Sequence, residues 1–273
     1  MSEDDFAFAV NVTDTMDWSL VEEDFKFMMT LEPEGCFVLL NNSERVGIVT
    51  TVSFGKIGWI GNLIVSENYR KKGAGALLVR HSLDYLKNKT VETVGLYAYI
   101  DTIPFYRRIG FEYDSEFIVL QGKGFSSPVQ ADVREISIED VRDIIDFDSS
   151  CFGSSRKKLL EPILLNSNNR CYMSCGNGQI VGYAAAKVYD GIAEIGPLVC
   201  LKGHNDLAAE LLKTTLKSLD GYHVSMCIPK KESMIHNLLK ASGFGESFSV
   251  ARMFFGYPSG EDCIYMAESL ERG

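Results

Sequence analysis

The sequence predicts an α/β protein of two tandem domains, each built on a mixed central sheet flanked by helices. The chain has 273 residues, whereas one domain typically has roughly 100–150. Apolar runs of strand length alternate with helical patterns, and the first strands are close enough in sequence to form antiparallel hairpins. Short motifs recur about half a chain apart, which indicates a duplicated fold.

The first half is expected to open with a helix at residues 20–31. Apolar runs then predict strands at residues 36–40, 46–54, 57–65 and 94–98. Between the last two strands, residues at helical spacing predict a helix that includes Leu77, Leu78, His81, Leu83 and Leu86.

Three pairs of motifs carry the repeat. The Val-Gly at residues 46–47 matches the Val-Gly at 181–182, and the Ile-Gly at 60–61 matches that at 195–196, both at an offset of 135. The Gly-Phe at 110–111 matches the Gly-Phe at 243–244 at an offset of 133. Chance could supply one pair, but three in the same order imply duplication.

A segment rich in Gly, Ser and Pro, residues 121–129, separates the copies and is typical of a linker. We expect an N-terminal domain at residues 1–122, a linker at 123–131 and a C-terminal domain at 132–273. The second domain should open with a strand and an amphipathic helix capped at Ser137, since Asp140 stands three residues later. Its other elements are expected as helices at 159–165, 206–219 and 233–241 and strands at 171–174, 180–188, 193–201 and 223–228.

Composition narrows the class of protein. A hydrophobic content of 46% with 23% charged residues is ordinary for a globular chain. No apolar run approaches the ~20 residues of a membrane span. The net charge of −10 argues against a nucleic-acid surface and is compatible with a cationic acceptor.

The N-terminus and the cysteines favour a cytoplasmic location. The first residues are acidic and lack the basic region of a secretory signal. Seven cysteines, an odd number mostly inside apolar runs, fit buried thiols in a reducing compartment better than a disulfide framework. Cys171 and Cys175 have no second Cys/His pair at matching spacing, so we expect no metal.

The most informative stretch is Arg70-x-x-Gly73-x-Gly75, which stands between a strand and a helix. This order aims backbone N–H groups at a phosphate, and the helix dipole adds a favourable potential. We expect Gly73 and Gly75 to permit a close approach and to take φ > 0. A P-loop and a dinucleotide fingerprint are excluded because the residues after Gly75 match neither pattern. An ordinary strand-to-helix turn is the alternative.

This pattern resembles the coenzyme A pyrophosphate loop of the GNAT acetyltransferase superfamily, Arg/Gln-x-x-Gly-x-Gly/Ala after the fourth strand. Further along, the stretch Phe-Tyr-Arg-Arg-Ile-Gly-Phe at residues 105–111 resembles the superfamily's Phe-Tyr-x-x-x-Gly-Phe helix. In the second half, residues 195–199 and 251–256 resemble the C-terminal domains of tandem acetyltransferases. The resemblance thus covers nearly the whole chain.

The resemblance implies an acetyl-CoA site in the first domain. Backbone groups of Leu63, Ile64 and Val65 would pair with the pantetheine arm as an added strand does. Tyr106 would donate a proton to the departing thiolate, whereas packing is the alternative role for an arbitrary tyrosine. The pyrophosphate would bind the turn formed by Arg70, Lys71, Lys72, Gly73, Ala74, Gly75 and Ala76.

The sequence alone does not decide the roles of several residues near the predicted site. Lys71 and Lys72 could attract the 3′-phosphate or simply be solvated. Tyr99 stands where the superfamily often has an Asn that contacts the cofactor arm. No general base is identified, because the acids at residues 22–24 occupy the ordinary place for acids at a helix start. Direct transfer needs no cysteine nucleophile.

The second copy differs from the first at the site. By the repeat, Gly73 becomes Ala208, Gly75 becomes Glu210 and Tyr106 becomes Leu239. A glutamate at the phosphate-facing turn would repel pyrophosphate. We therefore expect a degenerate second domain with an acceptor-side or structural role.

The resemblance implies a GNAT-type N-acetyltransferase, an acyltransferase of class EC 2.3.1.-. It would transfer acetyl from acetyl-CoA to a primary amine by direct attack on the thioester. The alternatives are a transferase for a longer acyl-CoA and a CoA-binding sensor without turnover. The expected partner is a small-molecule or peptide amine, with no nucleic acid and no membrane, and the chain could be a monomer or a homodimer.

Overall fold

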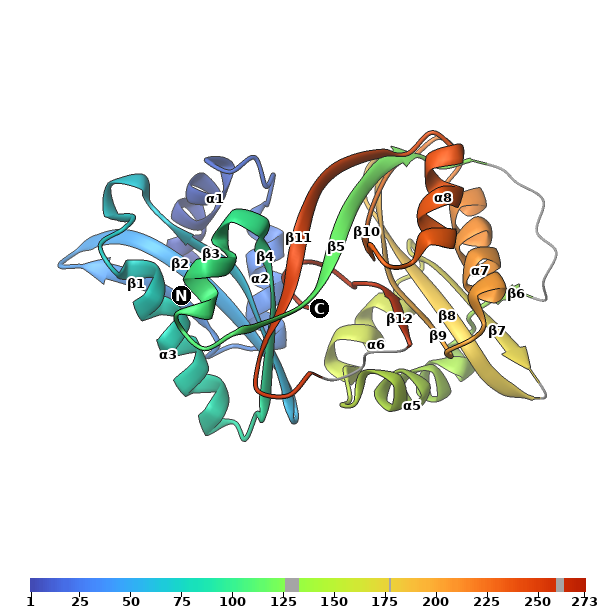
Figure 1. Ribbon diagram of the computed structural model, residues 1–273, viewed down its shortest axis with the longest axis horizontal. Coiled ribbons are helices and arrows are strands. Elements are labelled where there is room, and N and C mark those ends of the chain that lie inside the picture. The colour runs from blue at the N-terminus through green and yellow to red at the C-terminus, as the bar shows by residue number, and fades with distance from the viewer. Residues whose placement is uncertain (126–132, 177, 259–262) are drawn as a thin grey trace.

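One continuous mixed sheet runs through both halves of the molecule, and helices cover both of its faces (Figure 1). The computed structural model describes residues 1–125, 133–176, 178–258 and 263–273. The strand order is β1-β2-β3-β4-β11-β5-β10-β9-β8-β7-β6, and β12 pairs with β9 off this path. We call residues 1–125 the first half and residues 133–273 the second half.

The strands are β1 (Cys36–Asn41), β2 (Glu44–Phe54), β3 (Ile57–Val65), β4 (Thr93–Tyr99), β5 (Glu112–Lys123), β6 (Val133–Glu135), β7 (Arg170–Gly176), β8 (Gln179–Val188), β9 (Ile192–Cys200), β10 (His223–Pro229), β11 (Gly245–Phe255) and β12 (Ile264–Met266). The α-helices are α1 (Phe6–Asp14), α2 (Glu22–Leu31), α3 (Ala74–Asn88), α4 (Ile103–Arg107), α5 (Val141–Phe152), α6 (Lys157–Leu165), α7 (Asn205–Ser218) and α8 (Ser233–Ala241).

In the first half, successive residues of β2 point to opposite faces of the sheet, as the period of a strand requires. Ile48 packs in a cluster with residues of α1 and α2. Val49 packs instead in a cluster with Leu78 and Val79 of α3. The sheet is therefore buried on both faces here, which agrees with the burial of every β2 residue from Val46 to Val52.

The two halves exchange their last long strands. Chain order would place β5 beside β4, but β4 pairs with β11, from the second half. In turn β5, from the first half, pairs with β10 of the second half. The exchanged strands also pair with each other and lie side by side at the centre of the molecule (Figure 1). Each half therefore completes its sheet with a strand of the other.

The halves also share a hydrophobic core. One cluster joins Met28 and Trp59 of the first half to Ile144 and Leu159 of the second. Burying such a cluster removes apolar surface from water, at about 25 cal/mol per Å². The shared core and the exchanged strands make the two halves one folding unit.

Glu32 is the polar centre of this junction. Its carboxylate accepts hydrogen bonds from Lys158 Nζ on α6 (2.7 Å), from the Tyr85 hydroxyl on α3 (2.6 Å) and from the Ser53 N–H on β2 (2.9 Å). Burial opposes the ionisation of Glu32, but these hydrogen bonds lower its pKa to about 2. The ionised carboxylate thus holds elements of both halves together.

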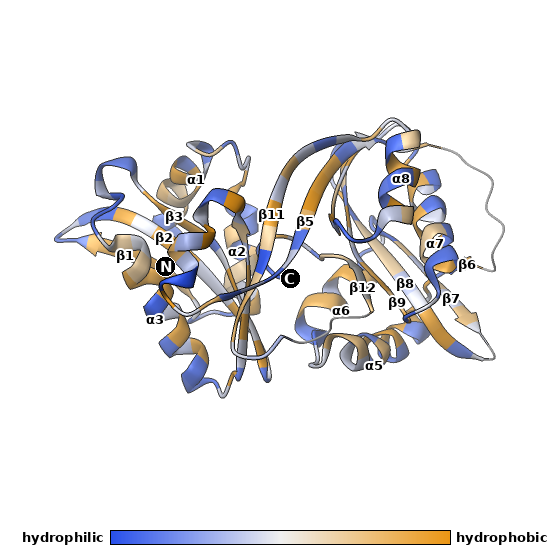
Figure 2. Ribbon diagram, viewed as in Figure 1, coloured by the Kyte–Doolittle hydropathy of each residue, from blue (hydrophilic) through white to orange (hydrophobic). Residues whose placement is uncertain are grey.

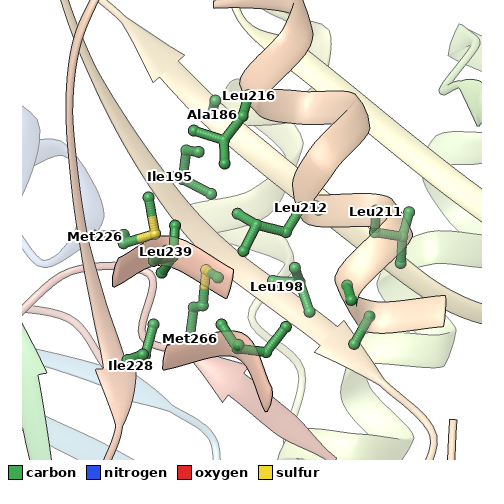
Figure 3. Packing of buried hydrophobic residues seen from close by; sticks show 14 of the residues in the cluster. Ala186, Ile195, Leu198, Leu211, Leu212, Leu216, Met226, Ile228, Leu239 and Met266 are labelled. Atoms are coloured by element: carbon green, nitrogen blue, oxygen red, sulfur yellow. The ribbon is translucent and has the colours of Figure 1, made fainter. Parts of the chain in front are cut away.

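The second half has its own core between the sheet and α7 and α8. Figure 3 shows Leu211, Leu212 and Leu216 of α7 beside Ile195 and Leu198 of β9, with further residues of β8, β10, α8 and β12 around them. In Figure 2, hydrophobic and hydrophilic residues alternate around α3 and α7. This is the pattern of helices with one face on a core and one in water.

Most expected elements are confirmed. The three early strands, the helix after the glycine turn, and every helix and strand expected from residue 159 to residue 241 are present within a few residues of their expected ends. The capping box is also confirmed, since the Ser137 hydroxyl and N–H both donate to the Asp140 carboxylate. The sequence reasoning missed α1, β5, β11 and β12.

The expected linker was partly wrong. Gln121, Gly122 and Lys123 continue β5, where they pair with β10. Gly122 serves close packing there, because a Cβ at this position would lie 2.6 Å from the Phe244 ring. Residues 126–132 lie outside the described residues, and the domain boundaries at 122 and 132 stay predictions.

Candidate acetyltransferase site

The candidate site lies where β3 and β4 separate. These strands pair in parallel only from Ile57 to Trp59 and from Thr93 to Gly95. Beyond that point the sheet opens into a cavity of about 820 Å³. Its lining comes from the end of β3, the β4–α4 region, the loop at residues 16–19, the central strands and residues 270–271 of the second half.

Leu63, Ile64 and Val65 form one wall of this cavity. The Ser66 N–H donates to the Val46 carbonyl of β2. The backbone groups of successive strand residues point alternately to the two neighbouring strands. The N–H and C=O of Ile64 therefore also face β2, whereas those of Leu63 and Val65 point toward the opening. The opening therefore presents backbone groups to which an extended ligand can add as a strand does.

A β-bulge in β3 determines which way the residues of the wall at Leu63, Ile64 and Val65 point. The pairing with β2 shifts between Ile48 and Thr50, and Asn62 has a φ of 49°. A bulge inserts one residue and so reverses which side chains face each side of the strand. As a result Ile60 and Val65 pack on the same face, in the cluster that includes α3.

Arg70 to Ala76 form a turn that ends at the start of α3. Gly73 is the N-cap with a φ of 89°, and Lys71 also has a positive φ, 61°. The prediction of a positive φ was right for Gly73 but wrong for Gly75, which is already helical. A Cβ at Gly75 would lie 3.4 Å from the Phe105 ring, an ordinary contact.

The start of α3 offers the groups that an anion needs. The first intrahelical bond runs from the Leu77 N–H to the Gly73 carbonyl. The preceding N–H groups, those of Gly73, Ala74, Gly75 and Ala76, have no intrahelical acceptor, as at every helix start. The Arg70 side chain lines the cavity, but its Nε donates to the Val65 carbonyl (2.9 Å). Lys71 and Lys72 are exposed beside this turn.

Tyr106 lines the same cavity from α4. Its side chain is only 8% exposed and packs against the rings of Phe105 and Phe111. The hydroxyl makes no hydrogen bond to another described residue, so its proton is free for a ligand. Burial raises the pKa of the phenol well above its usual range, which keeps the hydroxyl protonated at neutral pH.

A loop between α1 and α2, residues 16–19, closes one side of the cavity. The indole Nε1 of Trp18 donates to the Tyr99 hydroxyl (2.9 Å), so Tyr99 anchors this loop. Asp17 and Ser19 both have positive φ values, 55° and 54°. Such strained residues cluster at functional sites. Sequence reasoning missed this loop because it did not find α1.

The second half contributes the opposite wall, which the sequence did not localise. Glu194 of β9, Cys227 of β10 and Phe248 of β11 line the cavity together with Leu270 and Glu271. Residues 270–271 reach the first half directly, since a Cβ at Gly61 of β3 would lie 2.6 Å from the Glu271 backbone. The cavity is thus built by both halves.

The second half fills its own corresponding opening. β9 and β10 pair in parallel up to Ile195 and Met226 and then separate. In that gap β12 pairs with β9 at Leu198 and Val199, and the Ala267 N–H donates to the Cys227 carbonyl of β10. By the repeat, Leu198 and Val199 correspond to Leu63 and Ile64. The chain itself therefore occupies the place at which the first half has its open wall.

The turn after β9 differs from the phosphate turn, because its positive-φ glycine, Gly203 (φ 85°), precedes the N-cap residue His204. Ala208 and Glu210 lie inside α7, which begins at Asn205. The expectation that Glu210 faces a turn was therefore wrong, because its carboxylate pairs with Lys213 on the same helix (2.7 Å). α7 starts earlier, relative to the repeat, than α3 does.

Comparison with known proteins identifies the family. Residues 3–111 match the acetyltransferase (GNAT) family, and residues 144–265 match an acetyltransferase (GNAT) domain. The chain belongs to the GNAT N-acetyltransferases and carries two GNAT domains. This family implies an acyl-CoA co-substrate and an amine acceptor.

Relatives support the two-domain arrangement. An uncharacterised N-acetyltransferase of Bacillus subtilis, YitH, is 22% identical over 78% of this chain and 75% of its own length. The structure of a putative acetyltransferase from Pyrococcus horikoshii has a TM-score of 0.81 at 22% identity, over 100% of this chain and 94% of its own. A tandem GNAT protein from the clavulanic acid biosynthesis pathway has a TM-score of 0.56 at 12% identity, over 88% of each chain.

Across the described residues, no helix is both long and apolar enough to cross a bilayer. The same part of the chain contains no group of three or more His, Cys, Asp or Glu residues that could hold a metal ion.

Proposed function

We propose that the protein transfers the acetyl group of acetyl-CoA to a primary amine by direct attack on the thioester. The observation that carries the proposal is that Tyr106 shares one cavity with the backbone groups of Leu63 and the N–H of Val65, which point toward the opening; the Val65 carbonyl is held by Arg70 Nε. Those groups fit an amide-bearing pantetheine arm, which would pair as an added strand. The turn from Arg70 to Ala76 fits the pyrophosphate.

The chain's own groups supply the steps of transfer. The site holds the amine beside the thioester, which replaces a bimolecular encounter by an oriented one. The amine nitrogen bonds to the carbonyl carbon, and the carbon–sulfur bond breaks. Tyr106 donates its hydroxyl proton to the departing sulfur, the proton that the nitrogen loses passes to water, and the Tyr106 phenolate then takes a proton back from water. A tyrosine hydroxyl is protonated at neutral pH, and burial raises the pKa of Tyr106 further above its usual range.

We also propose that the second half does not bind acetyl-CoA and instead completes the acceptor side. Two observations support this: residues 263–267 pair inside the second opening, and the N-cap of α7 is His204, whereas the N-cap of α3 is Gly73. Cys227 and Glu194 of the second half meanwhile line the first cavity.

The test is release of CoA from acetyl-CoA, measured against a panel of amines and beside longer acyl-CoA donors. Amine-dependent turnover that is fastest with acetyl-CoA is the expected result. Faster turnover with a longer donor would make the protein a different acyltransferase. Tight CoA binding with no amine-dependent turnover would refute transfer and indicate a sensor.

A further inference from the structure

The wall that the second half contributes to the cavity is acidic. Glu194 and Glu271 line this wall, and Asp17 and Asp101 line the opposite side. Among the described residues that line the cavity, Arg70 is the only Lys or Arg. Its Nε is already engaged by the Val65 carbonyl. The electrostatic potential of the cavity therefore favours a cation.

Glu194 is the accessible end of a buried chain of charges. Its carboxylate pairs with Lys187 Nζ (2.7 Å), Lys187 pairs in turn with Glu268, and Glu268 pairs with Arg272 (2.8 Å). The side chains of Lys187 and Glu268 are 7% and 0% exposed, whereas that of Glu194 is 34% exposed. Lys187 thus fixes the position of Glu194 and leaves part of its carboxylate open to the cavity.

Glu271 adds a second carboxylate on the same wall. Among the described residues no Lys or Arg lies within ion-pair distance of its carboxylate; the adjacent Arg272, whose pKa Glu271 helps to raise, pairs with Glu268 instead. Burial raises the pKa of Glu194, and the nearby Glu268 and Glu271 act in the same direction against Lys187. A cation bound between Glu194 and Glu271 would relieve this repulsion.

Asn62 gives an independent sign of a ligand. It lines the cavity and is only 7% exposed. Its amide nitrogen donates to the Thr50 hydroxyl (3.2 Å), but its Oδ1 has no hydrogen-bond partner. A buried acceptor without a donor is destabilising. An N–H group of a bound ligand would remove this destabilisation.

We propose that the acceptor is a small aliphatic amine with at least two ammonium groups. This inference rests on the proposed function and names the substrate class of the same site. One amine reacts at the thioester, and the second ammonium group is held by Glu194 and Glu271. Val119, Phe248 and Leu270 supply apolar surface for the methylene groups between them. Glu194 and Glu271 are specificity-determining residues.

The experiment compares two acceptors of matched length, 1,4-diaminobutane and 4-aminobutan-1-ol, with acetyl-CoA as donor. The diamine should have the lower KM. Glu194→Gln and Glu271→Gln keep the side-chain shape and remove one charge each. Since a charge-assisted hydrogen bond contributes about 1.5–3 kcal/mol, each should raise the KM for the diamine by roughly tenfold to a hundredfold. The KM values for the amino alcohol and for acetyl-CoA should not change.

Glu92→Gln is the matched control, because Glu92 is exposed, pairs with Lys56 and does not line the cavity. It should leave both KM values as in the wild type. Calorimetric titration of 1,4-diaminobutane into the protein with CoA present gives a readout independent of turnover. The same two variants should weaken that binding, and an unchanged thermal transition would show that they fold.

Equal KM values for the two acceptors, or a diamine KM that neither glutamine variant raises, would overturn the inference. So would a preference for lysine-containing peptides over both amines. In each of these cases amine-dependent turnover would still support the proposed function. Absence of turnover with every amine, by contrast, would refute the proposed function itself.

Discussion

Replacing Tyr106 by phenylalanine removes a single oxygen atom from the cavity wall. The ring contacts with Phe105 and Phe111, at centroid distances of 4.9 and 5.8 Å, are kept. Because the hydroxyl makes no hydrogen bond to a described residue, no buried partner is left unsatisfied. The variant should therefore fold normally and lose only the proton donor.

The expected loss is in kcat. General acid catalysis contributes on the order of 10²–10⁴-fold, which is roughly 3–5 kcal/mol of activation free energy. The affinity for acetyl-CoA should change little, because the phenol acts only as the sulfur departs. Steady-state kinetics with the best acceptor, together with calorimetric binding of CoA, separate these two quantities.

Tyr113→Phe is the control, since Tyr113 lies on β5, is 44% exposed and does not line the cavity. It should have wild-type kcat. Tyr99→Phe should lower kcat less than Tyr106→Phe does, because the Tyr99 hydroxyl accepts a hydrogen bond from the indole of Trp18 and does not donate a proton to the sulfur. An unchanged kcat for Tyr106→Phe would refute the catalytic role and leave Tyr106 as a packing residue.

Three further predictions follow from other parts of the structure. Calorimetry should find one CoA per chain, because residues 263–267 pair inside the second opening; two equivalent sites would contradict this. Gly75→Glu should abolish CoA binding with an unchanged thermal transition, whereas Gly75→Ala, whose Cβ makes an ordinary contact with Phe105, should bind normally; near-normal affinity of the glutamate variant would place the phosphates elsewhere. Glu32→Gln should lower the free energy of unfolding at pH 7 by about 1–3 kcal/mol. The folded pKa of Glu32, about 2, lies below its usual value, so its stabilisation is present above about pH 4.5 and is lost as the pH falls toward 2. Urea unfolding of both proteins at pH 7 and pH 3 should show a difference that shrinks with acid; a difference independent of pH would refute the assignment.

Local pattern was enough to predict much of the fold. Apolar runs identified β2 and β3, and the glycine turn identified the start of α3, because in these places the local pattern and the final contacts agree. β5 and β11 could not be placed in the same way. Their partners are set by an exchange between distant segments, such as Tyr99 with Val250, and no local pattern encodes that pairing.

The same distinction between short motifs and long-range packing applies to the residues of the candidate site. Tyr106 and the turn at Arg70 belong to short motifs, and the structure brings them to one cavity wall or its mouth. Glu194, Phe248 and Glu271 belong to no motif, since each reaches the cavity only through the packing of the second half. The loop at residues 16–19 was missed with α1. The acidic wall could not be predicted, because Glu194 and Glu271 are far apart in the sequence and their spacing matches no motif.

The exchange of β5 and β11 also sets an order of events during synthesis. A chain leaves the ribosome from its N-terminus, and domains usually fold as they emerge. Here one edge of β4 pairs with β11, which spans Gly245–Phe255, so the nascent first half carries an unpaired edge until β11 has been synthesised. Exposed edges of this kind promote aggregation. The half that carries Tyr106 and the open wall of the cavity is therefore translated first, yet its sheet is completed only after β11 has been made.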